Sequence, residues 1–163
     1  MAAKKENPIY KLDFPKDQWE EAAALESGTI VRDWFDEGIR ILIMTGPASF
    51  NAYLGLPLDH PLAGFDYDSI HINAHGGLTF ASKGDRYLPS GYYWYGLDYT
   101  HLGDKNFYTI KEETKHIFEK FPKLHENETA WTIEMIEKDL WSTIYDMKAL
   151  MKLAERIAKK YGG

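Results

Sequence analysis

The stretch between Ile70 and Lys105 reads I-H-I-N-A-H-G-G-L-T-F-A-S-K-G-D-R-Y-L-P-S-G-Y-Y-W-Y-G-L-D-Y-T-H-L-G-D-K. Two segments in which apolar and polar residues alternate flank a turn rich in Gly and Pro, a pattern typical of two strands. Both segments carry His, Asn, Thr or Asp side chains that can bind a ligand or take part in a reaction. The stretch therefore predicts a polar site on a small sheet.

Three segments upstream of this stretch are rich in β-branched and aromatic residues and predict further strands. The turn at residues 36–38 is short enough for a hairpin, which favours antiparallel pairing. We therefore expect five strands, at residues 29–35, 39–45, 50–56, 69–73 (with an extension to 80 left open) and 92–100. A short edge strand is also expected over residues 8–14.

The C-terminal part of the chain is expected to be helical. Residues 132–161 form the clearest helix, because apolar residues recur there every three or four positions. These residues are Ile136, Leu140, Ile144, Met147, Met151, Ala154 and Ala158. Shorter helices are expected from Pro15 to about Ser27 and over residues 110–121, the second ended by Pro122.

Together these elements predict a single α+β domain over residues 1–163. We expect a mainly antiparallel sheet of about five strands with a long C-terminal helix, and a frayed leader over residues 1–8. The helix either lies across one face of the sheet or pairs with its copy in a homo-oligomer.

The composition excludes several classes of function. The chain of 163 residues has no cysteine, which rules out disulfides, thiolate metal sites and a cysteine nucleophile. Its formal net charge of -6 argues against general nucleic-acid binding, which depends on Lys and Arg at the phosphates. No apolar run is long enough to span a bilayer, and the N-terminus lacks the apolar centre of a signal peptide. We therefore expect a cytoplasmic protein without a membrane partner.

The candidate site combines a glycine pair with polar and aromatic side chains. The backbone N–H groups of adjacent glycines could cradle an anion or let a ligand approach closely. Nearby rings could stack on a base, and cations on the turn would favour an anionic group. The candidate ligand-binding residues are His75, Gly76, Gly77, Thr79, Arg86, Trp94, Asp98, His101 and Asp104.

Four of these residues allow three different interpretations. His75, Asp98, His101 and Asp104 offer imidazole and carboxylate groups, which suit a divalent metal such as Zn or Mn. The same groups suit acid–base chemistry, in which a carboxylate orients a histidine. In a purely structural role, Asp98 and Asp104 would hydrogen-bond to the loop backbone and hold His101 in place.

The segments H-G-G-L-T-F (75–80) and W-Y-G-L-D-Y-T-H-L-G-D (94–104) resemble motifs of small bacteriophage-encoded proteins of unknown function. The upstream segment G-L-P-L-D-H-P-L-A-G (55–64) is similar to a Gly/Pro loop of the same proteins, and the resemblance covers roughly residues 30–105. It implies a location in the host cytoplasm. It also favours a site made of His75, Gly76, Gly77, Thr79, Asp98, His101 and Asp104.

Three functions are compatible with these observations. The first is a binding module that sequesters a small polar, nucleotide-like signal of host defence. The second is a metal-dependent hydrolase of a phosphoester or amide, with a metal-bound water as nucleophile. The third is a protein-interaction domain that inhibits a host enzyme. We favour the first, because no complete metal or nucleophile motif is present.

Overall fold

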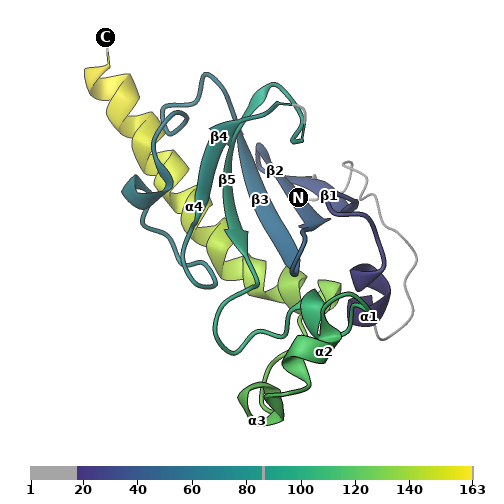
Figure 1. Cartoon of the computed structure of the whole chain (residues 1–163). Helices are drawn as coiled ribbons and strands as arrows, with labels where there is room; N and C mark the ends of the chain where they lie inside the picture. Colours follow the sequence, from purple (N-terminus) through teal and green to yellow (C-terminus); the bar gives the residue numbers. More distant parts are fainter. Residues whose placement is uncertain (1–17, 86, 163) are drawn as a thin grey trace.

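The computed structural model describes residues 18–85 and 87–162, in which a five-stranded antiparallel sheet is covered on one face by a long helix (Figure 1). The strands are β1 (Ile30–Asp36), β2 (Ile39–Thr45), β3 (Phe50–Pro57), β4 (Phe80–Lys83) and β5 (Tyr92–Asp98). Their order in the sheet is β1-β2-β3-β5-β4, so the last two strands are exchanged relative to the sequence. The predicted α+β fold is confirmed.

The long helix α4 (Ile133–Tyr161) matches the predicted C-terminal helix. Thr132 caps its first turn, since the Thr132 side chain accepts a hydrogen bond from the backbone N–H of Met135 at 3.2 Å. The predicted apolar stripe is buried from Ile136 to Met151 in one cluster with the inward-facing residues of the sheet, Ala154 packs against it partly buried, and Ala158 lies outside the cluster. The stripe therefore packs on the sheet. The opposite side of α4 exposes Trp141 and Tyr145, each 71% accessible, and a homo-oligomer through this helix stays a prediction.

The alternation along β5 sorts its side chains between the two faces of the sheet. Tyr95 and Leu97 join the core under α4, whereas Trp94 belongs to a second, smaller cluster on the other face. Trp94 covers Gly55 of β3, where an added Cβ would lie 2.6 Å from the indole ring. The Trp94 indole N–H donates to the carbonyl of Pro89 at 2.9 Å, so the loop after β4 closes over this part of the open face.

The strand expected at residues 69–73 is wrong, because Tyr67–Ser69 form a 3-10 turn and the strand of this region is β4. Asn73 explains the difference: its backbone N–H donates to Asp146 and its side-chain amide donates to Ser142, both on α4. The segment therefore runs along the helix and does not pair with a strand. Since it is not a strand, the alternation along residues 70–75 does not place His71, Asn73 and His75 together on one face of the sheet.

The shorter helices differ from the predictions. The helix expected over residues 110–121 is reduced to α2 (Lys115–Phe118), and Pro122 does not end a helix but begins α3 (Pro122–His125). Proline at a first helical position costs no hydrogen bond, which accounts for this start. The described part of the first predicted helix is α1 (Gln18–Ala23). The edge strand expected at residues 8–14 and the leader at 1–8 lie outside the described residues.

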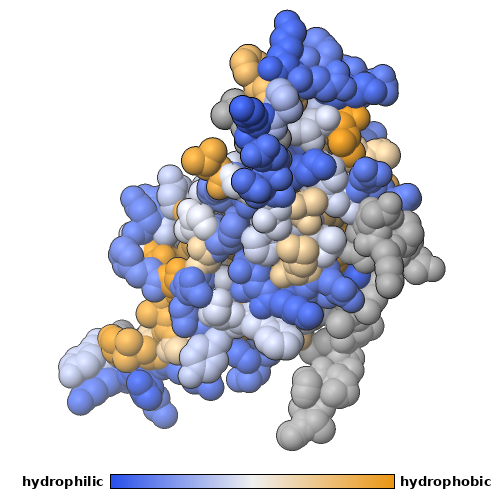
Figure 2. Space-filling view, turned by 90° about the horizontal axis from the view of Figure 1, so that it is seen from below, coloured by the Kyte–Doolittle hydropathy of each residue, from blue (hydrophilic) through white to orange (hydrophobic). Residues whose placement is uncertain are grey.

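The three short helices gather at one end of the sheet, and α4 runs from that end to the opposite one (Figure 1). The face of the molecule seen in Figure 2 is mostly hydrophilic, with smaller hydrophobic patches between the polar side chains. Over the described part of the chain, no helix has the length and apolar character needed to cross a bilayer.

Candidate functional site

Asp104 lies at the centre of a hydrogen-bond network that joins three loop segments. Its Oδ2 is 2.7 Å from Nε2 of His75 and accepts the backbone N–H of His101 at 2.9 Å. Its Oδ1 accepts the indole N–H of Trp131 at 2.8 Å. The Asp104 side chain is only 5% exposed. The carboxylate thus ties the Gly76-Gly77 segment, the loop after β5 and the residues before α4 together.

Aromatic rings enclose His75 within this network. The His75 ring stacks on Tyr99 with centroids 4.7 Å apart and 9° between the planes, and it contacts Trp131 at 4.8 Å. The Tyr99 hydroxyl donates to Asp139 of α4 at 2.8 Å. We call His75, Tyr99, Asp104 and Trp131 the Asp104 network. Because its groups satisfy one another, the network anchors loops against α4 and leaves little of His75 for a ligand.

Burial raises the pKa of the Tyr99 hydroxyl above its ordinary value of 10.0, and the Asp139 carboxylate raises it further. The folded protein therefore holds this proton more tightly than the unfolded chain. The resulting stabilisation is complete below pH 10 and is lost as the pH rises beyond that value. Stability should fall at alkaline pH for this reason.

We expect Tyr99→Phe to lower the free energy of unfolding at pH 7 by about 1.5–3 kcal/mol, since a hydrogen bond to a charged group is lost. The variant should also show a weaker loss of stability between pH 10 and 11. Urea unfolding at a series of pH values measures both effects. Tyr145→Phe, on an exposed side chain of α4, is the matched control and should change neither. Equal pH dependence in the wild type and Tyr99→Phe would contradict the expectation.

His101 lies between this network and the open face of the sheet. Its ring meets His75 edge-on with centroids 5.4 Å apart, and its Nε2 is 3.4 Å from Oδ1 of Asp98. The contact with Asp98 is electrostatic only, because Nε2 has no partner in hydrogen-bond geometry. Gly76, at a φ of +69°, makes room for the ring, which an added Cβ would overlap. Gly76, the first glycine of the pair, therefore serves the packing of His101.

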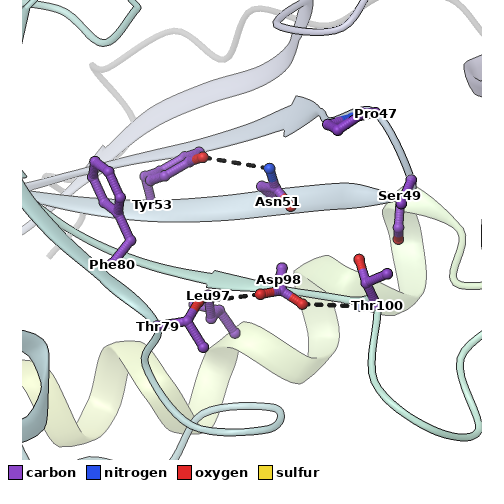
Figure 3. A pocket seen from close by; sticks show the side chains of 10 residues that line it. Pro47, Ser49, Asn51, Tyr53, Thr79, Phe80, Leu97, Asp98 and Thr100 are labelled. Atoms are coloured by element: carbon purple, nitrogen blue, oxygen red, sulfur yellow. Dashed lines mark hydrogen bonds between the residues drawn. The ribbon is translucent and has the colours of Figure 1, made fainter.

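A hollow of about 360 Å³ opens on the sheet face that α4 does not cover, at the end where β5 finishes (Figure 3). Its walls come from the turn between β2 and β3, from β3, from the start of β4 and from the end of β5. The lining residues are Pro47, Ala48, Ser49, Asn51, Tyr53, Thr79, Phe80, Leu97, Asp98 and Thr100. The volume is within the usual range for small-molecule sites.

Polar groups of the hollow retain hydrogen-bonding capacity. Oδ2 of Asp98 accepts the Thr79 hydroxyl at 3.1 Å, and Oδ1 accepts the backbone N–H of Thr100 at 3.1 Å. A carboxylate has about four acceptor positions, so these two bonds leave roughly half of them open. The Ser49 residue is 2% exposed, and its hydroxyl has no hydrogen-bond partner within the described part of the chain. A buried, unpaired hydroxyl costs free energy, and a bound ligand could satisfy it.

Two rings form the apolar wall. Tyr53 and Phe80 meet edge to face with centroids 5.5 Å apart, on either side of Gly96 of β5. A Cβ on Gly96 would lie 2.7 Å from the Tyr53 ring, so this glycine allows both rings to lie close to the sheet. Burial raises the pKa of Tyr53, and the nearby Asp98 raises it further, so Tyr53 is neutral at pH 7. Asp98 is the one acidic side chain among the ten described lining residues, and no basic side chain is among them.

The structure divides the predicted site residues between two places. Thr79 and Asp98 line the hollow, whereas His75 and Asp104 belong to the Asp104 network. Gly77, with a φ of +83°, faces open space. Trp94 is completely buried under the loop after β4 and lines no part of the hollow. Arg86 lies outside the described residues.

The four suggested metal ligands form two pairs. His75 is bound to Asp104, and His101 lies beside Asp98, with the edge-on contact of the two imidazoles between the pairs. Among the side chains that the structure describes, no three of His, Asp or Glu converge on a point where they could hold a metal ion.

Eight of the ten lining residues were not predicted as site residues from the sequence: Pro47, Ala48, Ser49, Asn51, Tyr53, Phe80, Leu97 and Thr100. A signal for two of them exists in the chain. Asn51 and Tyr53 alternate with inward residues of β3, and Asn51 pairs directly with Asp98 across the strands. Knowing that β3 and β5 are neighbours would have placed these side chains beside Asp98.

Comparison of the chain with protein-family models, curated proteins and solved structures finds no match.

Proposed function

We propose that this protein binds a small polar, nucleotide-like molecule in the hollow beside Asp98 and sequesters it. The observation that carries the proposal is the combination, in one cavity, of an accessible carboxylate, an unpaired buried hydroxyl and an aromatic wall. Ligand sites typically combine a few polar groups that fix orientation with an apolar surface that supplies affinity.

The aromatic wall favours a flat ring as part of the ligand. Phe80 is 37% exposed at the edge of the hollow, and its ring packs edge to face against the ring of Tyr53. Stacking of a base on such a ring is worth about 1–3 kcal/mol. The polar half of the hollow, around Ser49 and Asp98, then receives the sugar part of a nucleoside.

Phosphate groups fit outside the hollow, because the Asp98 charge would repel them. The Pro47 edge is the suitable side. The ammonium group of Lys111 donates there to the Pro47 carbonyl at 3.2 Å, and Pro47 itself lines the hollow. A nucleotide would accordingly place its nucleoside part inside and its phosphate near Lys111.

Sequestration without chemical change is the activity that we favour. The Asp104 carboxylate already has three hydrogen-bond partners, and His75 is packed between rings, so neither faces the hollow as a nucleophile or base. The resemblance to bacteriophage proteins also favours sequestration, because a phage would benefit from removing a nucleotide-like defence signal from the host cytoplasm.

Calorimetric titration with a panel of nucleosides and nucleotides tests this function. We expect saturable binding by the wild type, and recovery of the unchanged ligand by mass spectrometry. Phe80→Ala should weaken binding about 10-fold, from the value of one stacking contact. Phe65→Ala is the matched control, since Phe65 is 46% exposed but does not line the hollow.

Three results would count against the proposal. If no member of the panel binds, the hollow is not a nucleotide-like site. If the ligand is recovered hydrolysed or otherwise altered, the protein is an enzyme and sequestration is wrong. Equal weakening by Phe80→Ala and Phe65→Ala would place the ligand elsewhere on the surface.

A further inference from the structure

We infer that Asp98 recognises two neighbouring hydroxyl groups of the ligand, as on the ribose ring of a ribonucleoside. This inference rests on the proposed function and names the chemical class of the ligand more closely. It starts from the way in which the protein holds the Asp98 carboxylate at the end of β5.

Two hydrogen bonds fix the orientation of this carboxylate. The Thr79 hydroxyl donates to Oδ2 and the backbone N–H of Thr100 donates to Oδ1, so each oxygen accepts one internal hydrogen bond. Oδ1 also lies 3.4 Å from Nε2 of His101, which is not in hydrogen-bond geometry. Figure 3 shows these two bonds on either side of Asp98, along one wall of the hollow. Each oxygen keeps about one further acceptor position, and the pair matches two adjacent O–H donors.

The charge of the hollow makes hydroxyl donors the suitable partners. Asp98 accepts hydrogen bonds and offers none when ionised, and no cation is among the ten described residues of the lining. Hydrogen bonds to an ionised acceptor are stronger than neutral ones, so a diol gains more here than at an amide. A phosphate or carboxylate group would instead bring like charges together.

The Ser49 hydroxyl supplies a second, neutral contact. It is buried at the turn between β2 and β3 and lacks a partner among the described residues, and Ser49 lines the same hollow as Asp98. A hydroxyl can donate and accept, so it can complete the hydrogen bonds of a sugar whose diol is held by Asp98. The hollow thus offers separate contacts for the diol, the rest of the sugar and the base.

Removing one ligand hydroxyl leaves an acceptor position of a charged group unpaired. Loss of such a bond corresponds to roughly a 10- to 100-fold change in affinity. We therefore expect each 2′-deoxyribonucleoside to bind 10- to 100-fold more weakly than the matching ribonucleoside. The base and the charge are the same within each pair, so the difference reports the diol alone.

Calorimetry with the four ribonucleosides and their 2′-deoxy counterparts tests the inference on the wild-type protein. Asp98→Asn replaces one acceptor oxygen by a donor, and the preference for ribose should then fall below about 3-fold. Asp59→Asn makes the same chemical change at an exposed aspartate beyond the other end of β3 and should keep the full preference. Circular dichroism checks that both variants are folded.

The outcomes separate the two levels of the proposal. Binding of ribo- and deoxyribonucleosides with equal affinity would overturn the diol inference and leave nucleoside binding intact. A ribose preference that survives in Asp98→Asn would also overturn it. Binding by neither series would overturn both the diol inference and the proposed function. If Asp98→Asn is misfolded, Thr79→Val serves in its place: it frees one carboxylate oxygen, and the ribose preference should change while the fold is kept.

Discussion

Asp104→Ala is expected to lower the free energy of unfolding by about 3–5 kcal/mol. The substitution leaves three part-buried donors without an acceptor: the His75 ring, the backbone N–H of His101 and the Trp131 indole. An unsatisfied buried donor costs about 1–3 kcal/mol, and the three share one site, so their costs do not add fully. The loss is large relative to the total stability of a domain of this size.

Urea unfolding followed by circular dichroism measures this effect, with Asp98→Ala as the matched control. Asp98 also accepts two hydrogen bonds close to a histidine, but its side chain is 32% exposed, whereas that of Asp104 is 5% exposed. Water can replace the lost partners of Asp98, so Asp98→Ala should cost no more than about 1.5 kcal/mol. Similar losses in the two variants would show that the Asp104 network does not anchor the loops.

The fold was largely predictable because its elements carry strong local signals. The strands at 39–45 and 50–56 and the helix at 132–161 match β2, β3 and α4 closely. Their patterns of apolar residues are long, and most of the residues that these patterns place inside are buried in the structure. The segment at 69–73 alternates as clearly as β5, but Asn73 hydrogen-bonds to α4 and the positive φ of Gly76 and Gly77 ends any extended conformation. Local alternation could not reveal these partners, which are distant in the sequence.

The candidate site was predictable only in part, for a similar reason. The sequence identifies His75, Asp98 and Asp104 as chemically capable residues, but not which of them satisfy one another. Trp131, which completes the Asp104 network, lies 27 positions from Asp104 in the chain and carried no signal of its own. The lining of the hollow depends on the pairing of β3 with β5 and not with β4, which brings Asn51 beside Asp98 and Tyr53 beside Gly96. Pairing of strands that are not consecutive is set by the whole core.

Gly76 is the site of the second large expected effect on stability. Gly76→Ala is expected to lower the free energy of unfolding by about 2–5 kcal/mol, because the new methyl group overlaps the His101 ring and the residue must keep a φ of +69°. Gly77→Ala is the matched control. Its φ of +83° imposes a similar backbone strain, but an added Cβ there meets no atom within 4 Å. The control should cost about 1–2 kcal/mol, the price of a left-handed conformation for a non-glycine residue.

A double-mutant cycle with His101→Ala isolates the steric part of the Gly76 effect. Removing the imidazole creates space for the methyl group, so Gly76→Ala should cost only about 1–2 kcal/mol in the His101→Ala background, the same as Gly77→Ala in the wild type. If Gly76→Ala is equally destabilising with and without the imidazole, His101 does not occupy the space above Gly76. Such a result would contradict the contact between His75 and His101. It would also contradict the link that His101 makes between Asp98 and the Asp104 network.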